Sequence, residues 1–197
     1  MRSTKRMVLI AVFAALIIVG GLISVPIPFT QIQLSFQVVF VLAAGMLLGG
    51  RDGALAVLIY ITMGLVGLPV FTQGGGIGYV LIPSFGYLLG FPIGALVCGV
   101  VCGSAQKPTR GRAFVGALLG MIPIYAIGVG YQILILYYYV GSAWSAVVGG
   151  LPAIAVLALK DAVLCGVSAS LYPALKRALR SIGLTCDKNK KIPLAVK

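Results

Sequence analysis

Apolar residues occur along the chain in six long runs, which are separated by short segments rich in glycine, proline or charge. The runs cover approximately residues 7–25, 34–48, 54–68, 84–103, 113–140 and 152–175. A helix of about 20 apolar residues crosses a bilayer, where the backbone must satisfy its own hydrogen bonds. The pattern predicts an all-α integral membrane protein with six transmembrane helices, folded as a single membrane domain over residues 1–197.

The basic residues follow the ends of these runs. Of the 15 lysines and arginines, all except Lys160 fall at the N-terminus, at residue 51, at 107–112 or after residue 175. All of these positions lie on one side of a six-span arrangement, and loops rich in lysine and arginine stay cytoplasmic. We therefore expect both termini to be cytoplasmic, with residues 181–197 as a cytoplasmic tail.

The composition excludes several function classes. The net charge is +12, but the basic residues flank apolar runs and form no water-exposed face, so we expect no nucleic-acid partner and a surface in contact with membrane lipid. The chain has no histidine and no paired cysteine motif, which argues against a metal site. The glycines at 74–78 lack the Gly-Lys-Ser/Thr ending of a phosphate loop, so we expect no ATP site and no other cofactor.

Two opposite charges, Lys160 and Asp161, stand together inside the sixth apolar run. A charge at the bilayer centre costs about 2.5–3.5 kcal/mol on insertion scales, so it is retained where it faces a partner, a cavity or a substrate. A rise of 1.5 Å per residue places the pair about 14 Å below the outer surface. The alternative is a pair that only neutralises neighbouring helices; we favour a binding site.

The chain offers little for catalysis, because it lacks histidine and a second carboxylate inside the apolar runs, and we expect it not to be an enzyme. A binding pocket needs only apolar walls and a few polar groups. The side chains that could complete a pocket around Lys160 and Asp161 are Gln37, Gln73, Tyr79, Tyr87 and Phe85, under a glycine-rich segment that contains Gly75. Each of them could instead contact a neighbouring helix or the membrane interface.

Ala11 and Ala15 form a pair of small residues, one helical turn apart, in the first apolar run. Such a pair lets another helix approach closely in a membrane. From this spacing alone, the pair serves either internal packing or contact with a partner.

Several segments together resemble a known family. In chain order they are PIPFT from residue 26, Gln37, LAAGMLLG from residue 42, GAL from residue 53, GLPVF from residue 67, the glycine segment, and PSFGYLLGF from residue 83. In order and spacing they are similar to the BioY family, the biotin-specific S-components of energy-coupling factor (ECF) transporters. The resemblance is dense from about residue 26 to residue 94 and sparser beyond.

The resemblance implies a multi-pass protein of the bacterial cell membrane with the S-component fold, which captures biotin from outside with high affinity. Energy for uptake would come from a separate ECF module of two cytoplasmic ATPases and a transmembrane coupling protein. Small residues on the first helix of such S-components contact the coupling protein, so Ala11 and Ala15 become candidates for that contact.

The resemblance also implies roles in the pocket. The family's sixth helix opens with Pro-Gly-Asp-x-x-Lys; Asp161 matches the aspartate, Lys160 replaces the glycine and Leu164 replaces the lysine. Positions 160 and 164 share a helix face, so Lys160 offers an ammonium one turn away. Asp161 would accept N–H groups of a ureido ring, while Lys160 would hold Asp161 ionised or bind a ligand carbonyl or carboxylate.

These departures leave the ligand open between biotin and a related compound, such as lipoate or a biotin precursor. A self-sufficient secondary transporter is the other alternative, although such proteins show internal repeats and only a faint one is visible here.

Overall fold

The computed structural model describes residues 2–26, 33–103, 109–141, 144 and 149–181. Its helices in this described part are α1 (Arg2–Leu22), α2 (Gln37–Leu48), α3 (Gly50–Leu65), α4 (Phe85–Gly103), α5 (Arg110–Leu134) and α7 (Leu151–Ser181), with a 3-10 helix η1 (Ile77–Leu81) and a π-helical turn η2 (Ile135–Tyr139). Two short strands, β1 (Ser24–Pro26) and β2 (Gln33–Ser35), pair antiparallel. The prediction of a helical membrane protein is confirmed.

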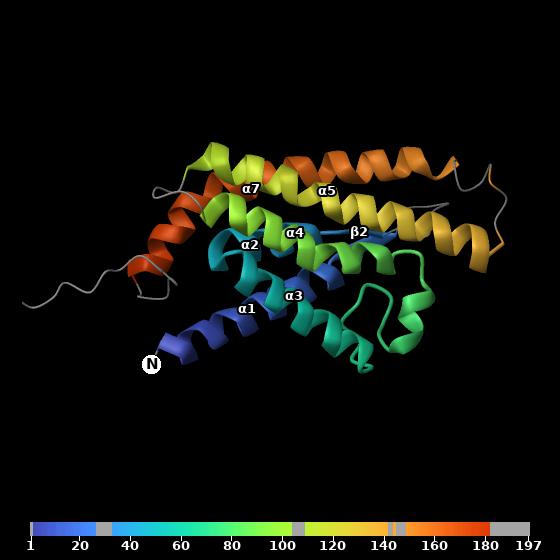
Figure 1. Ribbon diagram of the computed structural model, residues 1–197, viewed down its shortest axis with the longest axis horizontal. Coiled ribbons are helices and arrows are strands. Elements are labelled where there is room, and N and C mark those ends of the chain that lie inside the picture. Colours follow the sequence, from blue (N-terminus) through green and yellow to red (C-terminus); the bar gives the residue numbers. More distant parts are fainter. Residues whose placement is uncertain (1, 27–32, 104–108, 142–143, 145–148, 182–197) are drawn as a thin grey trace, which may run out of the picture.

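Four segments in the described residues are long and apolar enough to cross a membrane: Thr4–Leu22, Phe85–Gly103, Arg110–Tyr139 and Pro152–Leu179. Of the remaining two helices, α2 is shorter than the predicted run 34–48, whereas α3 has about the length of the predicted run 54–68. At 1.5 Å per residue, α2 is about 18 Å long and α3 about 24 Å, below the ~30 Å hydrocarbon thickness. The strand pair precedes α2 and the loop with η1 follows α3, so irregular segments continue from these short helices (Figure 1).

The strand pair corrects two predicted boundaries. The first helix ends at Leu22 and not at residue 25, and the second begins at Gln37 and not at residue 34. Pro26 has no backbone N–H to continue a helix, and it pairs in an extended conformation with Gln33.

Other boundaries also differ from the sequence pattern. Gly49 has a φ of 92°, a conformation open to glycine, so the chain reverses there and α3 begins at Gly50 instead of residue 54. The fifth run is a helix that ends in the turn η2. The sixth continues through Pro173 to Ser181, and the predicted tail beyond it, 182–197, lies outside the described residues.

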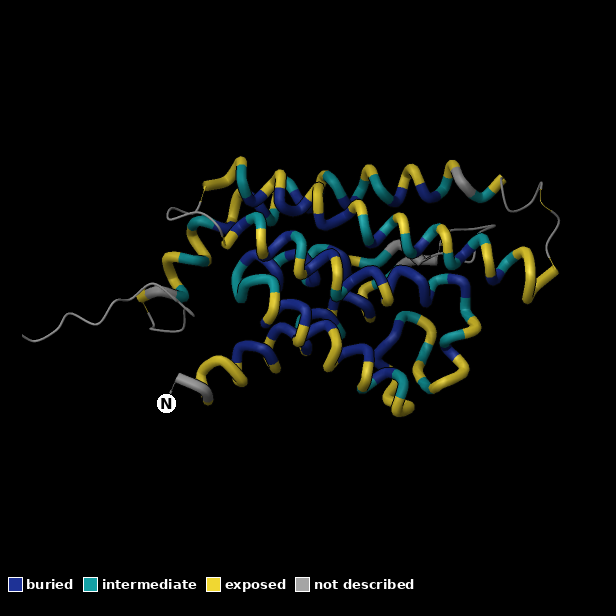
Figure 2. The backbone as a smooth tube through the Cα atoms, viewed as in Figure 1, coloured by how far each residue is buried: buried dark blue, intermediate teal, exposed yellow. Residues whose placement is uncertain are grey.

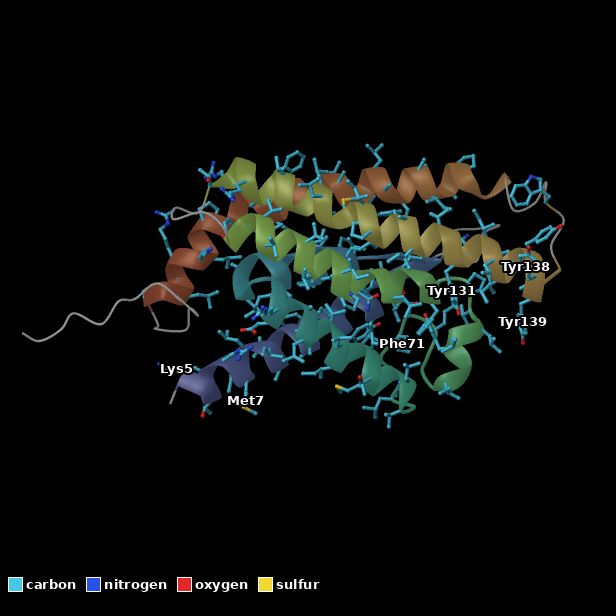
Figure 3. All side chains as sticks on the ribbon, viewed as in Figure 1. Lys5, Met7, Phe71, Tyr131, Tyr138 and Tyr139 are labelled. Carbon is cyan, nitrogen blue, oxygen red and sulfur yellow. The ribbon has the colours of Figure 1, made fainter. Side chains whose placement is uncertain are left out.

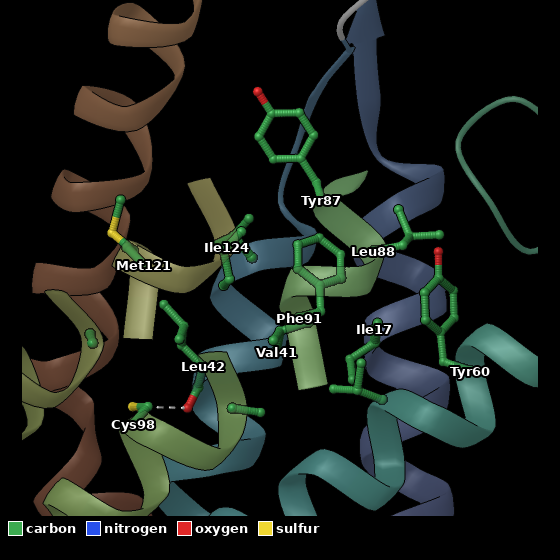
Figure 4. Close-up of a cluster of buried hydrophobic side chains, with 14 of the residues drawn as sticks. Ile17, Val41, Leu42, Tyr60, Tyr87, Leu88, Phe91, Cys98, Met121 and Ile124 are labelled. Atoms are coloured by element: carbon green, nitrogen blue, oxygen red, sulfur yellow. Dashed lines mark hydrogen bonds between the residues drawn. The ribbon is translucent and has the colours of Figure 1, made fainter. Parts of the chain in front are cut away.

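Helix α4 lies at the centre of the bundle, where it packs against α2, α3 and α5, while α7 packs against α5 and α2. Glycines allow the closest of these contacts: a Cβ on Gly45 would lie 2.3 Å from the Ala95 carbonyl oxygen. Buried residues face one another between the helices, and exposed residues line the outside (Figure 2). The centre of the bundle is filled by apolar side chains such as Leu42, Phe91 and Ile124 (Figure 4).

The helix ends that carry the basic residues lie at one end of the molecule. The start of α1, the α2–α3 turn, the end of α4, the start of α5 and the end of α7 gather there (Figure 1), with Lys5 at that end and Tyr138 and Tyr139 at the other (Figure 3). At the basic end the Arg6 guanidinium pairs with the Asp52 carboxylate, its Nε donating to Oδ2 at 2.8 Å. This separation fits the expected cytoplasmic position of both termini, which stays a prediction.

Candidate functional site

A cavity opens where α2 and α4 begin, beside α5 and α7 and beneath the loop that leads to η1. About 500 Å³ in and around it, including space open to the surroundings, is not filled by protein atoms. The lining residues come from distant parts of the chain: Ser35, Gln37, Val38, Thr72, Tyr79, Ser84, Tyr87, Leu88, Phe91, Tyr125, Leu157, Lys160 and Asp161.

A charged cluster forms one side of this cavity. Asp161 is 1% exposed, and its Oδ2 accepts a hydrogen bond of 2.7 Å from the Tyr125 hydroxyl. The Lys160 Nζ lies 2.6 Å from Asp161 Oδ1 and also donates to the backbone carbonyl of Ser35 at 2.5 Å. Since a buried carboxylate is costly without partners, the ammonium and the phenol stabilise its ionised form. The cluster links α5, α7 and β2.

Tyrosines from α4 and η1 contribute the remaining hydroxyls. Tyr87 donates to Gln132 Oε1 at 3.1 Å, and its ring meets the Tyr125 ring edge to face at 5.7 Å. Figure 4 shows Tyr87 with its hydroxyl pointing away from the buried apolar cluster. Tyr79 shares a hydrogen bond of 2.9 Å with Thr72, which holds η1 to the preceding loop. The ligand space therefore has aromatic walls with oriented hydroxyl groups.

Besides Asp161 Oδ1, which is ion-paired with Lys160, two buried polar atoms on lining residues have no hydrogen-bond partner within the described ranges. They are Gln37 Nε2, on a side chain 2% exposed, and Ser84 Oγ. A buried polar atom without a partner costs roughly 1–3 kcal/mol, so both atoms favour a ligand with hydrogen-bonding groups.

The glycine-rich loop is held against α3, and the residues at its two ends, Thr72 and Tyr79, line the cavity. The Gly76 N–H donates to the Gly64 carbonyl at 2.7 Å, and a Cβ on Gly75 would lie 2.0 Å from the Leu68 oxygen. Gly74 and Gly76 have φ values of 112° and 102°. At the other end of η1, the Tyr131 hydroxyl donates to the Val80 carbonyl. Backbone conformations that favour glycine thus allow the loop to turn tightly beside the end of α3.

Comparison with known proteins assigns the family. Residues 1–181 match the BioY family. A relative from Lysinibacillus sphaericus, named a probable biotin transporter BioY, is 49% identical over 146 residues, which cover 73% of this chain and 74% of the relative. A relative from Bacillus subtilis, named a putative biotin transporter BioYB, is 31% identical over 183 residues and 88% of both chains. The chain belongs to the BioY family.

A solved structure supports the fold. The crystal structure described as the S-component for biotin from an ECF-type ABC transporter aligns with a TM-score of 0.72 over 89% of this chain and 92% of its own, at 23% identity. The S-component fold and the multi-pass cell-membrane location expected from the sequence are therefore confirmed. Membership in a family of transporters also confirms that this BioY protein is not an enzyme.

The structure brings five of the predicted site residues together in the cavity of this BioY protein: Gln37, Tyr79, Tyr87, Lys160 and Asp161. It places three elsewhere. Gln73 and Gly75 are exposed on the loop. Phe85 is buried in the apolar core, in ring contact with Tyr79 and Tyr131 at centroid distances of 6.4 and 6.0 Å.

The sequence did not predict four polar residues that line the cavity: Ser35, Thr72, Ser84 and Tyr125. Tyr125 donates a hydrogen bond to Asp161, but it stands in the middle of an apolar run that contains other tyrosines. Its membrane depth could have indicated it: a tyrosine at about the same depth as the buried Asp161 carboxylate is a candidate partner, because a buried Tyr hydroxyl needs a hydrogen-bond partner.

Ala11 and Ala15 are both exposed on α1, outside the bundle. Residues that face inward from the same helix, such as Ile10, Ala14 and Ile17, are buried. The small pair is therefore not used in internal packing within the described part of the chain, and these two alanines form a short strip of α1 that is open to another helix.

Proposed function

We propose that this BioY protein binds biotin in the cavity beside Asp161 and serves as the substrate-binding subunit of an ECF transporter. The observation that carries the proposal is the buried cluster of Asp161, Lys160 and Tyr125 on the cavity wall. Relatives that match this chain over most of their length are named biotin transporters, which supports the same ligand here.

The cluster is complementary to a cyclic urea. A carboxylate accepts about four hydrogen bonds, so Asp161 keeps capacity for one N–H group of a ureido ring beside its contacts to Tyr125 and Lys160. An ammonium has three donors, and two of those on Lys160 point to Ser35 and Asp161, which leaves one for the ureido oxygen. Apolar walls from Leu88, Phe91 and Leu157 suit the sulfur ring and the aliphatic tail.

Biotin binding tests the proposal directly. The purified protein in detergent, examined by isothermal titration calorimetry, is expected to bind one biotin per chain with a sub-micromolar Kd, because buried hydrogen-bonding groups line the cavity beside apolar walls. Native mass spectrometry of the same preparation is expected to show biotin that co-purifies. Absence of any saturable biotin binding by folded protein would contradict the proposal.

The transport module is expected to use the exposed strip of α1. In the proposed assembly, Ala11 and Ala15 contact the transmembrane coupling protein, and two cytoplasmic ATPases supply energy; biotin is the transported ligand. The exposure of both alanines supports this arrangement. Because close helix contacts in membranes depend on small residues, larger side chains at these positions would separate the two proteins.

A double substitution, Ala11→Leu with Ala15→Leu, is expected to reduce co-purification with the ECF module about tenfold or more. The larger side chains would clash with the coupling protein, and a loss of about 1.4 kcal/mol in binding free energy lowers the affinity tenfold. Affinity for biotin in the isolated variant should stay at the wild-type value. The matched control is Ala155→Leu, the same change at an exposed position of α7. Equal co-purification of the double variant and the control would refute the role of the strip.

A further inference from the structure

Charge in the cavity is limited to two neighbouring residues. Among the described lining residues, Lys160 is the cation and Asp161 the anion. The other basic residues between 7 and 175 are at positions 51, 107, 110 and 112. Arg112 lies about 20 Å from Tyr125 along α5, and residue 51 follows the ~18 Å helix α2 whose first turn lines the cavity. Among the described residues, no cation other than Lys160 lines the cavity.

Lys160 is already engaged. Its Nζ lies 2.6 Å from Asp161 Oδ1 and 2.5 Å from the Ser35 carbonyl oxygen, and its side chain is 18% exposed. The pair is formally neutral, and it lies at one side of the cavity. Because Lys160 and Asp161 are adjacent, a ligand ring bound to Asp161 also lies beside Lys160. The tail of that ligand then extends away from both residues.

A tail carboxylate would therefore enter a site without a cation of its own. The charge of Lys160, Asp161 and the ligand together would be −1, and an uncompensated charge is costly in a low-dielectric site. The groups that remain for the tail are neutral donors, including Gln37 Nε2 and Ser84 Oγ, which have no partner among the described residues. Such donors serve the oxygen of a carboxylate, an amide or an ester.

We propose that the cavity selects the ring of its ligand and not the charge of its tail, so that its substrates form a wider class: cyclic ureas of the biotin type whose carboxyl group is free or is masked as an amide or ester. This inference rests on the proposed function and extends it from biotin to biotin derivatives with uncharged tails.

Three ligands distinguish the contribution of the ring to affinity from that of the tail charge. Their Kd values are measured by calorimetry on the same purified protein. Biotin has the ring and a carboxylate, biotin carboxamide has the ring and a neutral tail, and lipoate has a carboxylate but no ring N–H. Biotin and its carboxamide are expected to differ by less than about tenfold, the smallest loss typical of a removed charged hydrogen bond. Lipoate is expected to bind at least about a hundredfold more weakly, since it leaves Asp161 without N–H donors.

The Lys160→Gln variant provides the second measurement. If Lys160 serves Asp161 and the ring, as proposed, the substitution weakens biotin and biotin carboxamide by the same factor. If Lys160 instead binds the tail carboxylate, the substitution weakens biotin alone. A carboxamide that binds wild-type protein more than about tenfold more weakly than biotin, or a selective loss of biotin in the variant, overturns the inference.

The failure of this inference is distinguishable from that of the proposed function. Biotin that binds while its carboxamide does not removes the wider substrate class and leaves biotin binding intact. If neither compound binds, or if lipoate binds more tightly than both, the result contradicts the proposed function and, with it, the inference.

Discussion

Asp161→Asn is expected to raise the Kd for biotin by roughly 10- to 100-fold, the effect of losing hydrogen bonds to a charged group of about 1.5–3 kcal/mol. The carboxylate is 1% exposed, lines the cavity, and holds both Lys160 and Tyr125 in place. An amide of the same size accepts fewer hydrogen bonds and leaves the Lys160 ammonium without its counterion. Calorimetric titration with biotin measures the change.

The chain provides a matched control for this substitution. Asp52 is also buried and ion-paired, with Arg6, but it lies in the first turn of α3 and not among the cavity residues. Asp52→Asn is therefore expected to lower thermal stability while its Kd for biotin stays within about threefold of wild type. Wild-type affinity in folded Asp161→Asn protein would contradict the assignment of the site.

Should Asp161→Asn fail to fold, Tyr125→Phe tests the same cluster without a change in charge. It removes one hydrogen bond of 2.7 Å to Asp161 and keeps the ring that meets Tyr87. The expected rise in the Kd for biotin is about threefold to tenfold, as for one ordinary hydrogen bond. An unchanged Kd would show that Tyr125 does not orient Asp161 for the ligand.

Gly99→Ala is expected to destabilise the protein by about 3 kcal/mol, the upper part of the range for overpacking. A Cβ at this position would lie 2.2 Å from the Gly50 nitrogen and 2.6 Å from the Gly45 oxygen, which are backbone atoms that cannot rotate away. The turn between α2 and α3 would have to move from α4. In thermal unfolding in detergent, the Tm is expected to fall by about 6–12 °C.

The control for this prediction is Gly130→Ala, which makes the same change inside α5, where a Cβ would meet no atom within 4 Å. Alanine is intrinsically the better helix former, so this variant should match or slightly exceed the wild-type Tm. Equal losses in the two variants would mean that helix propensity, and not the close approach of α4 to the α2–α3 turn, determines the effect.

Much of the architecture could be predicted from local features of the sequence. Apolar runs predicted the membrane-spanning helices, and the order and spacing of segments between residues 26 and 94 predicted the family that residues 1–181 match. Two helix boundaries are exceptions, because they depend on a contact between two segments. The pairing of Ser24–Pro26 with Gln33–Ser35 shortened two predicted helices, because strand pairing depends on a second segment that a hydropathy pattern does not include.

The candidate site was predicted in part. Asp161 and Lys160 stood out because charges are rare and costly inside an apolar run. Gln73 and Phe85 were equally plausible by type and position, yet one is exposed on the loop and the other is packed in the core. Neutral polar and aromatic residues are common at both kinds of position, so their residue type does not distinguish between them.

By itself, the sequence determined the membrane class, the asymmetry of basic charge and the one charged pair inside an apolar run, since each follows from the cost of moving residues from water into lipid. Only the tertiary structure decided which side chains meet at the cavity. The Tyr125 hydroxyl on α5 donates to Asp161 on α7, and the Lys160 ammonium donates to the carbonyl of Ser35, which is 125 residues earlier in the chain. Such contacts depend on how helices pack against one another, which the periodicity of any single helix does not specify.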